Sequence, residues 1–200
     1  PVRPYPPASR SPQSISDDLD KNGMGFLYLN IENPNMDSEF LMALEVNGEL
    51  FEEGKDYFYF PENNEILIPV PAYTNEITVK AITNLQPQHN SKLSGLYQSD
   101  ECVITQCETE GFRRITPFLD RPDVLATYSV TVKGNQQRAP VLLSNGNKEK
   151  AHRNPLSGRH EVTFNDPLPK PSYLFALAAG NFDYIEDEYE YKEDDDQPLL

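Results

Sequence analysis

Short runs of apolar residues, separated by Gly, Pro and Asn, follow one another along the chain from Phe26 onward. They read FLYLNI, FLMALEVNG, YFYF, NEILIPV and NEITVKAI, and they are rich in β-branched and aromatic side chains. Residues of these types, bounded by turn-forming residues, are typical of β-strands. The pattern therefore predicts a series of short antiparallel strands.

Three segments alternate apolar and polar residues with a period of two: ITVKAI at 77–82, YSVTVKG at 128–134 and HEVTF at 160–164. Such alternation indicates strands with one buried face. Eighteen prolines in 200 residues leave few stretches for a long helix. The prediction is an all-β fold, a twisted antiparallel multi-strand domain of saddle-like or sandwich-like form.

A single segment, residues 118–126, suggests a helical turn. Asp120 could cap that turn and Pro122 could open it, because both residue types favour the first positions of a helix. Elsewhere Pro is expected to fix turns by restricting φ and removing a backbone donor. This second expectation applies to Pro167, Pro169 and Pro171.

Composition divides the chain into three parts. Residues 1–22 are rich in Pro and Ser and lack apolar periodicity, so we predict a disordered lead-in. Residues 23–184 hold the predicted strands and suit one large all-β unit. Residues 185–200 are an acidic segment. The formal net charge is −15, and residues 183–196 hold nine acids against one lysine.

The charge pattern argues against two classes of partner. Without a basic patch the chain has no footprint for phosphate backbones, and an anionic membrane surface is equally unattractive. No run approaches the ~20 apolar residues that cross a bilayer, and no secretory leader is visible. Cys102 and Cys107 are too few for a disulfide framework and would face opposite sides of a strand. Free thiols in a reducing, cytoplasmic compartment are expected.

The segment DLDKNG at 18–23 matches the opening half of a calcium-binding loop. The twelfth position of such a loop should be a bidentate Glu, but here it is Leu29, at the edge of an apolar strand. A polar turn before a strand is the favoured interpretation, and a calcium-dependent adhesion module is the weak alternative.

The string HEVTF at 160–164 begins like the zinc motif HExxH, in which two histidines on one helical face hold the metal. Phe164 stands where the second histidine must be, and the composition is that of a strand. His89 and His152 have no acidic or thiol partners at ligand spacing. We therefore expect no zinc site in this chain.

Three blocks of sequence follow one another in the second half of the chain. They read SGLYQSDECVITQCETEGFRRITPFLDRPD at 94–123, PVLLSNGN at 140–147 and GRHEVTFNDPLPKPSYLFALAAGNFD at 158–183. In content and order they closely resemble the N-terminal β-domain of the bacterial-type aminopeptidase N family of zinc gluzincin aminopeptidases. The resemblance is clear from about residue 93 to 184, weaker over 44–92 and not evident before. It implies a fragment of a larger metallopeptidase.

The resemblance also implies an activity for the parent protein. Members of this family remove single residues from the amino termini of peptides with the help of Zn²⁺. Their GAMEN and HExxH motifs would lie beyond residue 200, in a downstream catalytic domain, so the chain by itself should be inactive. The expected partners are that domain and peptide substrates with a free N-terminus. A non-catalytic β-sandwich interaction domain on the same scaffold is the alternative.

The candidate binding residues are Gln106 and Glu108, within the string ITQCETEGFRR. Residues two apart on a strand point to the same side, so an amide and a carboxylate would project together. Such a pair suits an ammonium group. By resemblance, Glu108 matches the glutamate that holds the substrate α-amine, and Gln106 matches a glutamine lining the pocket for the first side chain. Surface pairing with Arg113 or Arg114 is the alternative.

The same block carries several further charged residues. We expect them to form structural charge pairs around the loop rather than to bind substrate. They are Glu110, Arg113, Asp120, Arg121 and Asp123.

Overall fold

The computed structural model describes residues 24–35, 39–71 and 74–188, which form thirteen strands and three one-turn 3-10 helices. The predicted all-β class is confirmed. The strands are β1 (Met24–Asn30), β2 (Leu41–Val46), β3 (Glu49–Phe51), β4 (Phe58–Phe60), β5 (Glu65–Pro71), β6 (Val79–Thr83), β7 (Gly95–Ser99), β8 (Cys102–Gln106), β9 (Ala126–Asn135), β10 (Val141–Ser144), β11 (Asn147–Asn154), β12 (Arg159–Lys170) and β13 (Leu177–Gly180). The short helices are η1 (Pro87–His89), η2 (Phe112–Arg114) and η3 (Ser172–Leu174).

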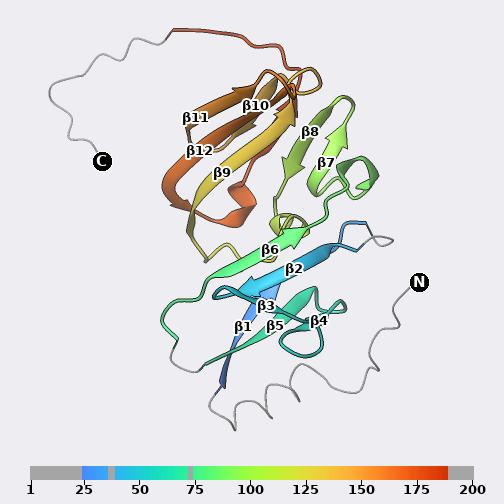
Figure 1. The fold of residues 1–200 in the computed structure, drawn as a ribbon, viewed down its shortest axis with the longest axis vertical. Helices are drawn as coiled ribbons and strands as arrows, with labels where there is room; N and C mark the ends of the chain where they lie inside the picture. Colours follow the sequence, from blue (N-terminus) through green and yellow to red (C-terminus); the bar gives the residue numbers. More distant parts are fainter. Residues whose placement is uncertain (1–23, 36–38, 72–73, 189–200) are drawn as a thin grey trace, which may run out of the picture.

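The strands pair into four antiparallel sheets, with the orders β1-β5-β4, β3-β2-β6, β10-β13-β8-β7 and β11-β12-β9. Strands β1 to β6 make the lower half of the molecule and strands β7 to β13 the upper half (Figure 1). We call these the first and second halves. Their separation gives the twisted multi-sheet form that the sequence predicts.

The first half packs around the central strand β5. Ile66, Leu67 and Ile68 are each 0% exposed. Ile66 and Ile68 belong to the same buried cluster as Leu29, whereas Leu67 packs with Phe60 in a second cluster. Because both faces of β5 are covered, its sequence is a continuous apolar run rather than an alternating one. Each such burial stabilises the fold by about 1.5–3 kcal/mol.

The second half packs β10 against the sheet β11-β12-β9. Leu142 of β10 is buried with Val132 of β9 and with Val162 and Phe164 of β12. The alternation in YSVTVKG and HEVTF therefore predicts the buried face correctly. HEVTF is part of a strand, and Phe164 is 5% exposed in the core.

Two features of the hairpin β11–β12 differ from the sequence-based expectation. Every residue of β11 is exposed, so it has no apolar alternation from which a strand could be predicted, and it is held by its pairing with β12. Pro167 and Pro169 lie inside β12 rather than in turns. The register of β12 with β9 is interrupted between Asp166 and Lys170, where missing backbone donors are tolerated.

The expected helical turn at 118–126 is absent, and this prediction was wrong. The segment bends through a turn closed by the Val124 amide, which donates to the Arg121 carbonyl over 3.2 Å. Asp120 does not cap a helix, because its buried carboxylate is occupied by other donors.

Several sequence-based expectations concern residues outside the described ranges. The lead-in at 1–22 and the DLDKNG segment both lie there, as does the end of the acidic segment from residue 189. The boundaries 23–184 remain a prediction, with β1 beginning at Met24.

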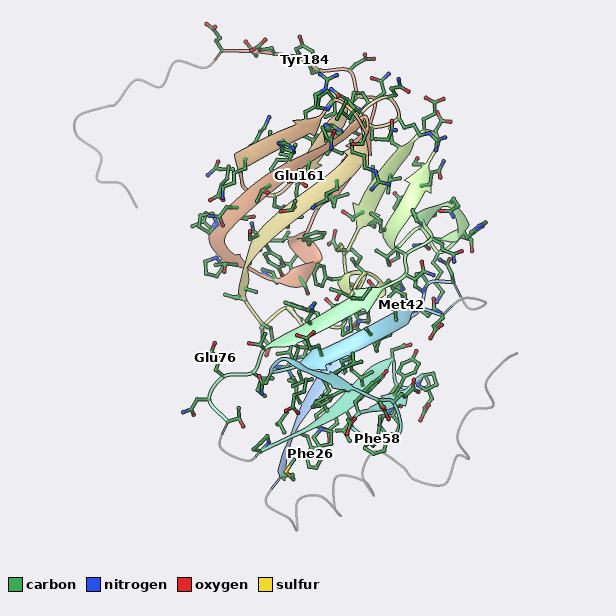
Figure 2. All side chains as sticks on the ribbon, viewed as in Figure 1. Phe26, Met42, Phe58, Glu76, Glu161 and Tyr184 are labelled. Atoms are coloured by element: carbon green, nitrogen blue, oxygen red, sulfur yellow. The ribbon has the colours of Figure 1, made fainter. Side chains whose placement is uncertain are left out.

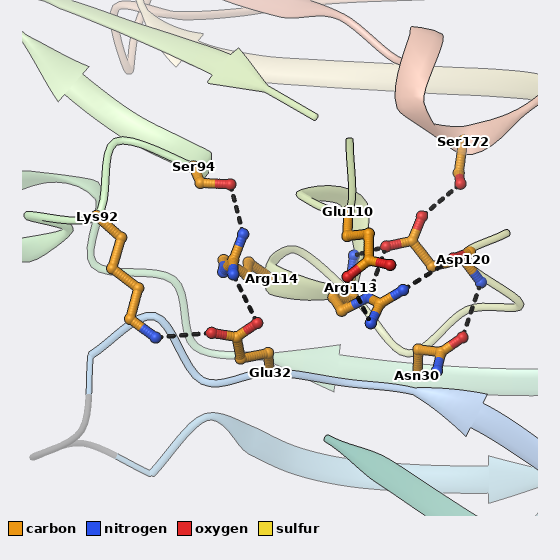
Figure 3. Close-up of polar contacts among 9 residues, drawn as sticks. All are labelled: Asn30, Glu32, Lys92, Ser94, Glu110, Arg113, Arg114, Asp120 and Ser172. Carbon is orange, nitrogen blue, oxygen red and sulfur yellow. Dashed lines mark hydrogen bonds and ion pairs between the residues drawn. The ribbon is translucent and has the colours of Figure 1, made fainter. Parts of the chain in front are cut away.

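Asp120, whose carboxylate is buried, joins three segments where the two halves meet (Figure 3). It accepts hydrogen bonds from the Arg113 backbone amide at 3.1 Å and from Arg113 Nε at 2.9 Å. Ser172 Oγ, at the start of η3, donates to its other oxygen over 2.5 Å. The Asp120 amide donates to Asn30 Oδ1 at the end of β1, over 3.2 Å. Asp120 thus ties η2 and η3 together through its carboxylate, and β1 through its backbone amide.

A second contact across the same junction is centred on Glu32 (Figure 3). Its carboxylate pairs with Arg114 and with Lys92, each over 2.7 Å. Its backbone amide donates to the Arg113 carbonyl over 3.0 Å. Burial disfavours the charged form, but the hydrogen bonds and charges of Lys92 and Arg114 outweigh it and lower the pKa of Glu32.

Replacing Asp120 should strongly destabilise the chain. Asp120→Ala leaves Arg113, whose side chain is 11% exposed, without its buried partner, and breaking a buried pair costs about 3–5 kcal/mol. The measurement is denaturant-induced unfolding. Asp123→Ala is the matched control, because its pair with Arg121 is exposed and should contribute about 1 kcal/mol or less. Equal losses in the two variants would contradict the role of Asp120.

The Glu32 contacts should make stability depend on pH. A carboxyl whose pKa is lower in the folded state stabilises it above the ordinary value of 4.5, and this contribution is lost as the pH falls through the folded pKa. The gap in unfolding free energy between the wild type and Glu32→Gln should therefore shrink below about pH 4.5. Unfolding curves at several pH values test this, and a gap that stays constant with pH would refute it.

Candidate functional site

The loop after β8 carries the candidate residues Gln106 and Glu108. β8 ends at Gln106, and the chain then turns so that the Gly111 amide donates to the Cys107 carbonyl over 2.8 Å. The expectation that Glu108 lies on the strand was therefore wrong. Gln106 and Glu108 are nevertheless both exposed on either side of the buried Cys107, and Gln106 Nε2 donates to the Glu108 carbonyl over 3.3 Å. The peptide bond between Glu108 and Thr109 is cis.

The turn at residues 107–111 is tightly packed against the rest of the chain. A Cβ atom on Gly111 would lie 2.3 Å from the Gln106 carbonyl oxygen and 2.7 Å from Cys107 Cα, so only glycine fits there. Cys107 is 2% exposed and packs with Phe112 and Tyr128. The sequence signal for this support was the glycine in ETEGF, which is equally compatible with an ordinary surface turn.

An aromatic cluster extends this packing beneath the turn. The ring of Phe112 meets Phe118 edge-on at 4.9 Å and Phe175 at 5.0 Å between centroids. Such edge-to-face contacts add about 0.5–1.5 kcal/mol each beyond area burial. The loop that carries Glu108 therefore packs on a base built from η2, the 118–126 turn and the residue after η3.

The two arginines near the loop are already engaged by other acids (Figure 3). Arg113 pairs with Asp120, and with Glu110 at 3.3 Å, whereas Arg114 pairs with Glu32. Within the described part of the chain, the Glu108 carboxylate has no ion pair. Surface pairing of Glu108 with Arg113 or Arg114 is thus not what the structure contains.

The predicted structural charge pairs are confirmed. In addition to the contacts of Arg113, Arg121 pairs with Asp123 over 2.9 Å. The sequence did not reveal that Asn30 and Ser172, which are remote in the chain, also form hydrogen bonds with Asp120.

The two cysteines are free, and neither forms a disulfide. Burial raises the pKa of the Cys107 thiol to about 12, and the nearby charge of Asp120 acts in the same direction. Cys107 therefore stays protonated and serves packing rather than nucleophilic chemistry.

The described residues contain neither a metal-binding cluster nor a membrane-spanning helix. No group of three or more His, Cys, Asp or Glu side chains there could hold a metal ion. His160 Nε2 makes a 2.7 Å hydrogen bond with the Ala139 carbonyl instead. No helix among the described residues is long and apolar enough to span a membrane.

Comparison with known proteins places this geometry in a family. The family model for the Peptidase M1 N-terminal domain matches residues 28–174. Aminopeptidase N of Haemophilus influenzae is 44% identical over 148 residues, and aminopeptidase N of Escherichia coli is 41% identical over 149 residues. Each match covers 74% of this chain and 16% of the relative, so the chain spans about a sixth of their length.

Solved structures share the fold. Legionella pneumophila aminopeptidase A, in complex with aspartic acid, matches with a TM-score of 0.69 and 38% identity, over 78% of this chain and 17% of that chain. An M1 zinc metallopeptidase from Deinococcus radiodurans has a TM-score of 0.56 at 18% identity, over 78% of this chain and 34% of that one, and supports the fold alone. The resemblance carried by the three sequence blocks is confirmed, and this chain belongs to the peptidase M1 N-terminal domain family.

Proposed function

We propose that this domain is the N-terminal part of a zinc-dependent aminopeptidase and supplies the carboxylate that anchors the substrate α-amine. The observation that carries the proposal is Glu108, an exposed carboxylate without an ion pair among the described residues, on a loop fixed by Gly111 and Cys107. The relatives named aminopeptidase N, 41–44% identical, support the reaction class.

A fixed carboxylate selects for a free amine in a simple way. It accepts charge-assisted hydrogen bonds from a substrate ammonium, which a blocked amino terminus cannot donate. Holding the ammonium at one point also fixes how far the first peptide bond lies from it, so one residue is removed at a time. The amide of Gln106, on the neighbouring exposed position, would contact the first side chain instead.

In this function, another part of the protein would bind the zinc ion. In zinc peptidases the metal polarises the scissile carbonyl and activates a water molecule. The described residues contain no cluster that fits the metal. We therefore assign substrate binding to this chain, and we assign metal binding to a downstream catalytic domain carrying HExxH and GAMEN.

We further propose a cytoplasmic location, and a non-catalytic interaction domain is the alternative function. Two free cysteines support a reducing, cytoplasmic location. A non-catalytic interaction domain would share this fold but would lack the catalytic partner. Reading the gene beyond residue 200 separates the two functions, since GAMEN and HExxH should follow only in the enzyme.

Removing the Glu108 carboxylate should impair catalysis in the complete protein. A hydrogen bond to a charged group contributes about 1.5–3 kcal/mol, and a desolvated charge pair costs about 3–5 to break. At about 1.4 kcal/mol per tenfold, Glu108→Ala should lower kcat/KM roughly 10- to 1000-fold. Gln106→Ala should have a smaller effect that depends on the first side chain of the substrate.

The measurement is kcat/KM on several aminoacyl substrates, with zinc content checked. Glu110→Ala is the matched control, because Glu110 is an exposed carboxylate of the same turn. Its loss leaves Arg113 still paired with Asp120. Near wild-type efficiency of Glu108→Ala at full zinc occupancy would exclude the assignment. So would an equal loss in the Glu110 variant.

The 200-residue chain alone should bind no zinc stoichiometrically and hydrolyse no aminoacyl substrate. Its HE pair lies in β12, with Phe164 in place of the second histidine. Metal analysis of the purified chain checks this expectation. One zinc per chain, removable only by a chelator, would show it to be wrong.

A further inference from the structure

Two strand edges border one groove in the second half. β10 pairs with β13 and β11 pairs with β12, and each is the outer strand of its sheet. The chain turns between them at Asn145 and Gly146, where Gly146 has φ +83°. A groove of about 620 Å³ lies between them and is lined by all of β10 and by much of β11. The outer edge of each strand is not paired with another described strand.

The groove has an apolar floor and a basic rim. The buried side chains of Leu142, Val162 and Phe164 line it from below. Lys148 and Arg153 of β11 line its rim, and neither forms an ion pair within the described ranges. The acid in the lining, Glu161, is already paired with Lys133 over 2.9 Å. A free strand edge offers backbone donors and acceptors, so such a groove suits an extended segment with acidic and apolar side chains.

Such a segment begins beside the groove in this chain. β13 ends at Gly180, which pairs with Val141, the first residue of β10 and part of the groove lining. Beyond it, residues 183–196 hold nine acids and one lysine, with Tyr and Ile among them. Figure 2 shows Tyr184 on the extended segment above the sheets. Tyr184 is 86% and Ile185 100% exposed, so neither apolar side chain is packed.

We propose that the acidic segment beginning at Asp183 docks into the groove between β10 and β11 of its own chain. The acids would face the rim cations, and the apolar side chains would cover the floor. Four Cα-to-Cα steps lead from Gly180 to Tyr184, and an extended chain covers about 3.3 Å per step, or roughly 13 Å in total, more than two strand spacings. The segment can therefore pass over the start of β10, and its tethering favours docking within one chain.

The charge distribution favours this occupant over an unrelated partner. The chain carries a net charge of −15, yet β11 holds Lys148, Lys150 and Arg153 against a single acid. Glu149, that acid, is already hydrogen-bonded to Asn165 Nδ2 over 2.9 Å. The proposal does not depend on the aminopeptidase assignment, because it concerns neither Glu108 nor its loop.

Hydrogen exchange of the 200-residue chain tests the docking. Outward-facing amides of β10 and β11 should exchange at least about tenfold faster when the chain is shortened to end at Phe182. The double variant Lys148→Glu/Arg153→Glu in the 200-residue chain should have the same effect. Lys55→Glu is the control, since Lys55 is exposed in the first half and should leave these amides unchanged.

Amides of the β9–β12 pairing report whether each variant remains folded. Equal exchange of β10 and β11 in the 200-residue and shortened chains, with β9–β12 intact, would overturn the proposal. Protection that grows with protein concentration would identify a second copy as the source of the segment, and would equally overturn docking within one chain.

Discussion

The buried carboxylate of Asp120 is the constraint on which the rest of the structure depends. Taking a carboxylate out of water is unfavourable unless donors replace the lost solvent. Here the donors come from Arg113 and Ser172, while the Asp120 amide is held by Asn30. These residues belong to segments that are remote in sequence. The junction between the two halves is therefore complete only when all of them are in place, which couples the two halves energetically.

This junction also determines which charges remain available. Arg113 is committed to Asp120 and Arg114 to Glu32, so the two cations nearest the 107–111 turn serve the fold. Glu108 is left with an exposed carboxylate on the same packed base. A binding carboxylate needs both properties: a fixed position, and no internal cation that would compete with the ligand.

The free strand edges show a different use of charge. β11 is fully exposed and carries cations along its length, a composition that discourages pairing with unrelated strands. The same cations border a groove whose floor is the apolar core of the second half. An edge protected against general association is thereby selective for acidic segments, one of which follows directly from β13 in the sequence.

Periodicity in the sequence determined the all-β class and the buried faces of β9 and β12, because alternation follows directly from strand geometry. The sequence blocks also determined the family, whereas the binding role of Gln106 and Glu108 remains a prediction. The tertiary structure alone decided that β8 stops at Gln106, that β11 is a strand, and that Asp120 binds Arg113 instead of capping a helix. Local propensity cannot settle these points, since a polar strand and a buried carboxylate are both stabilised by partners that are distant in sequence.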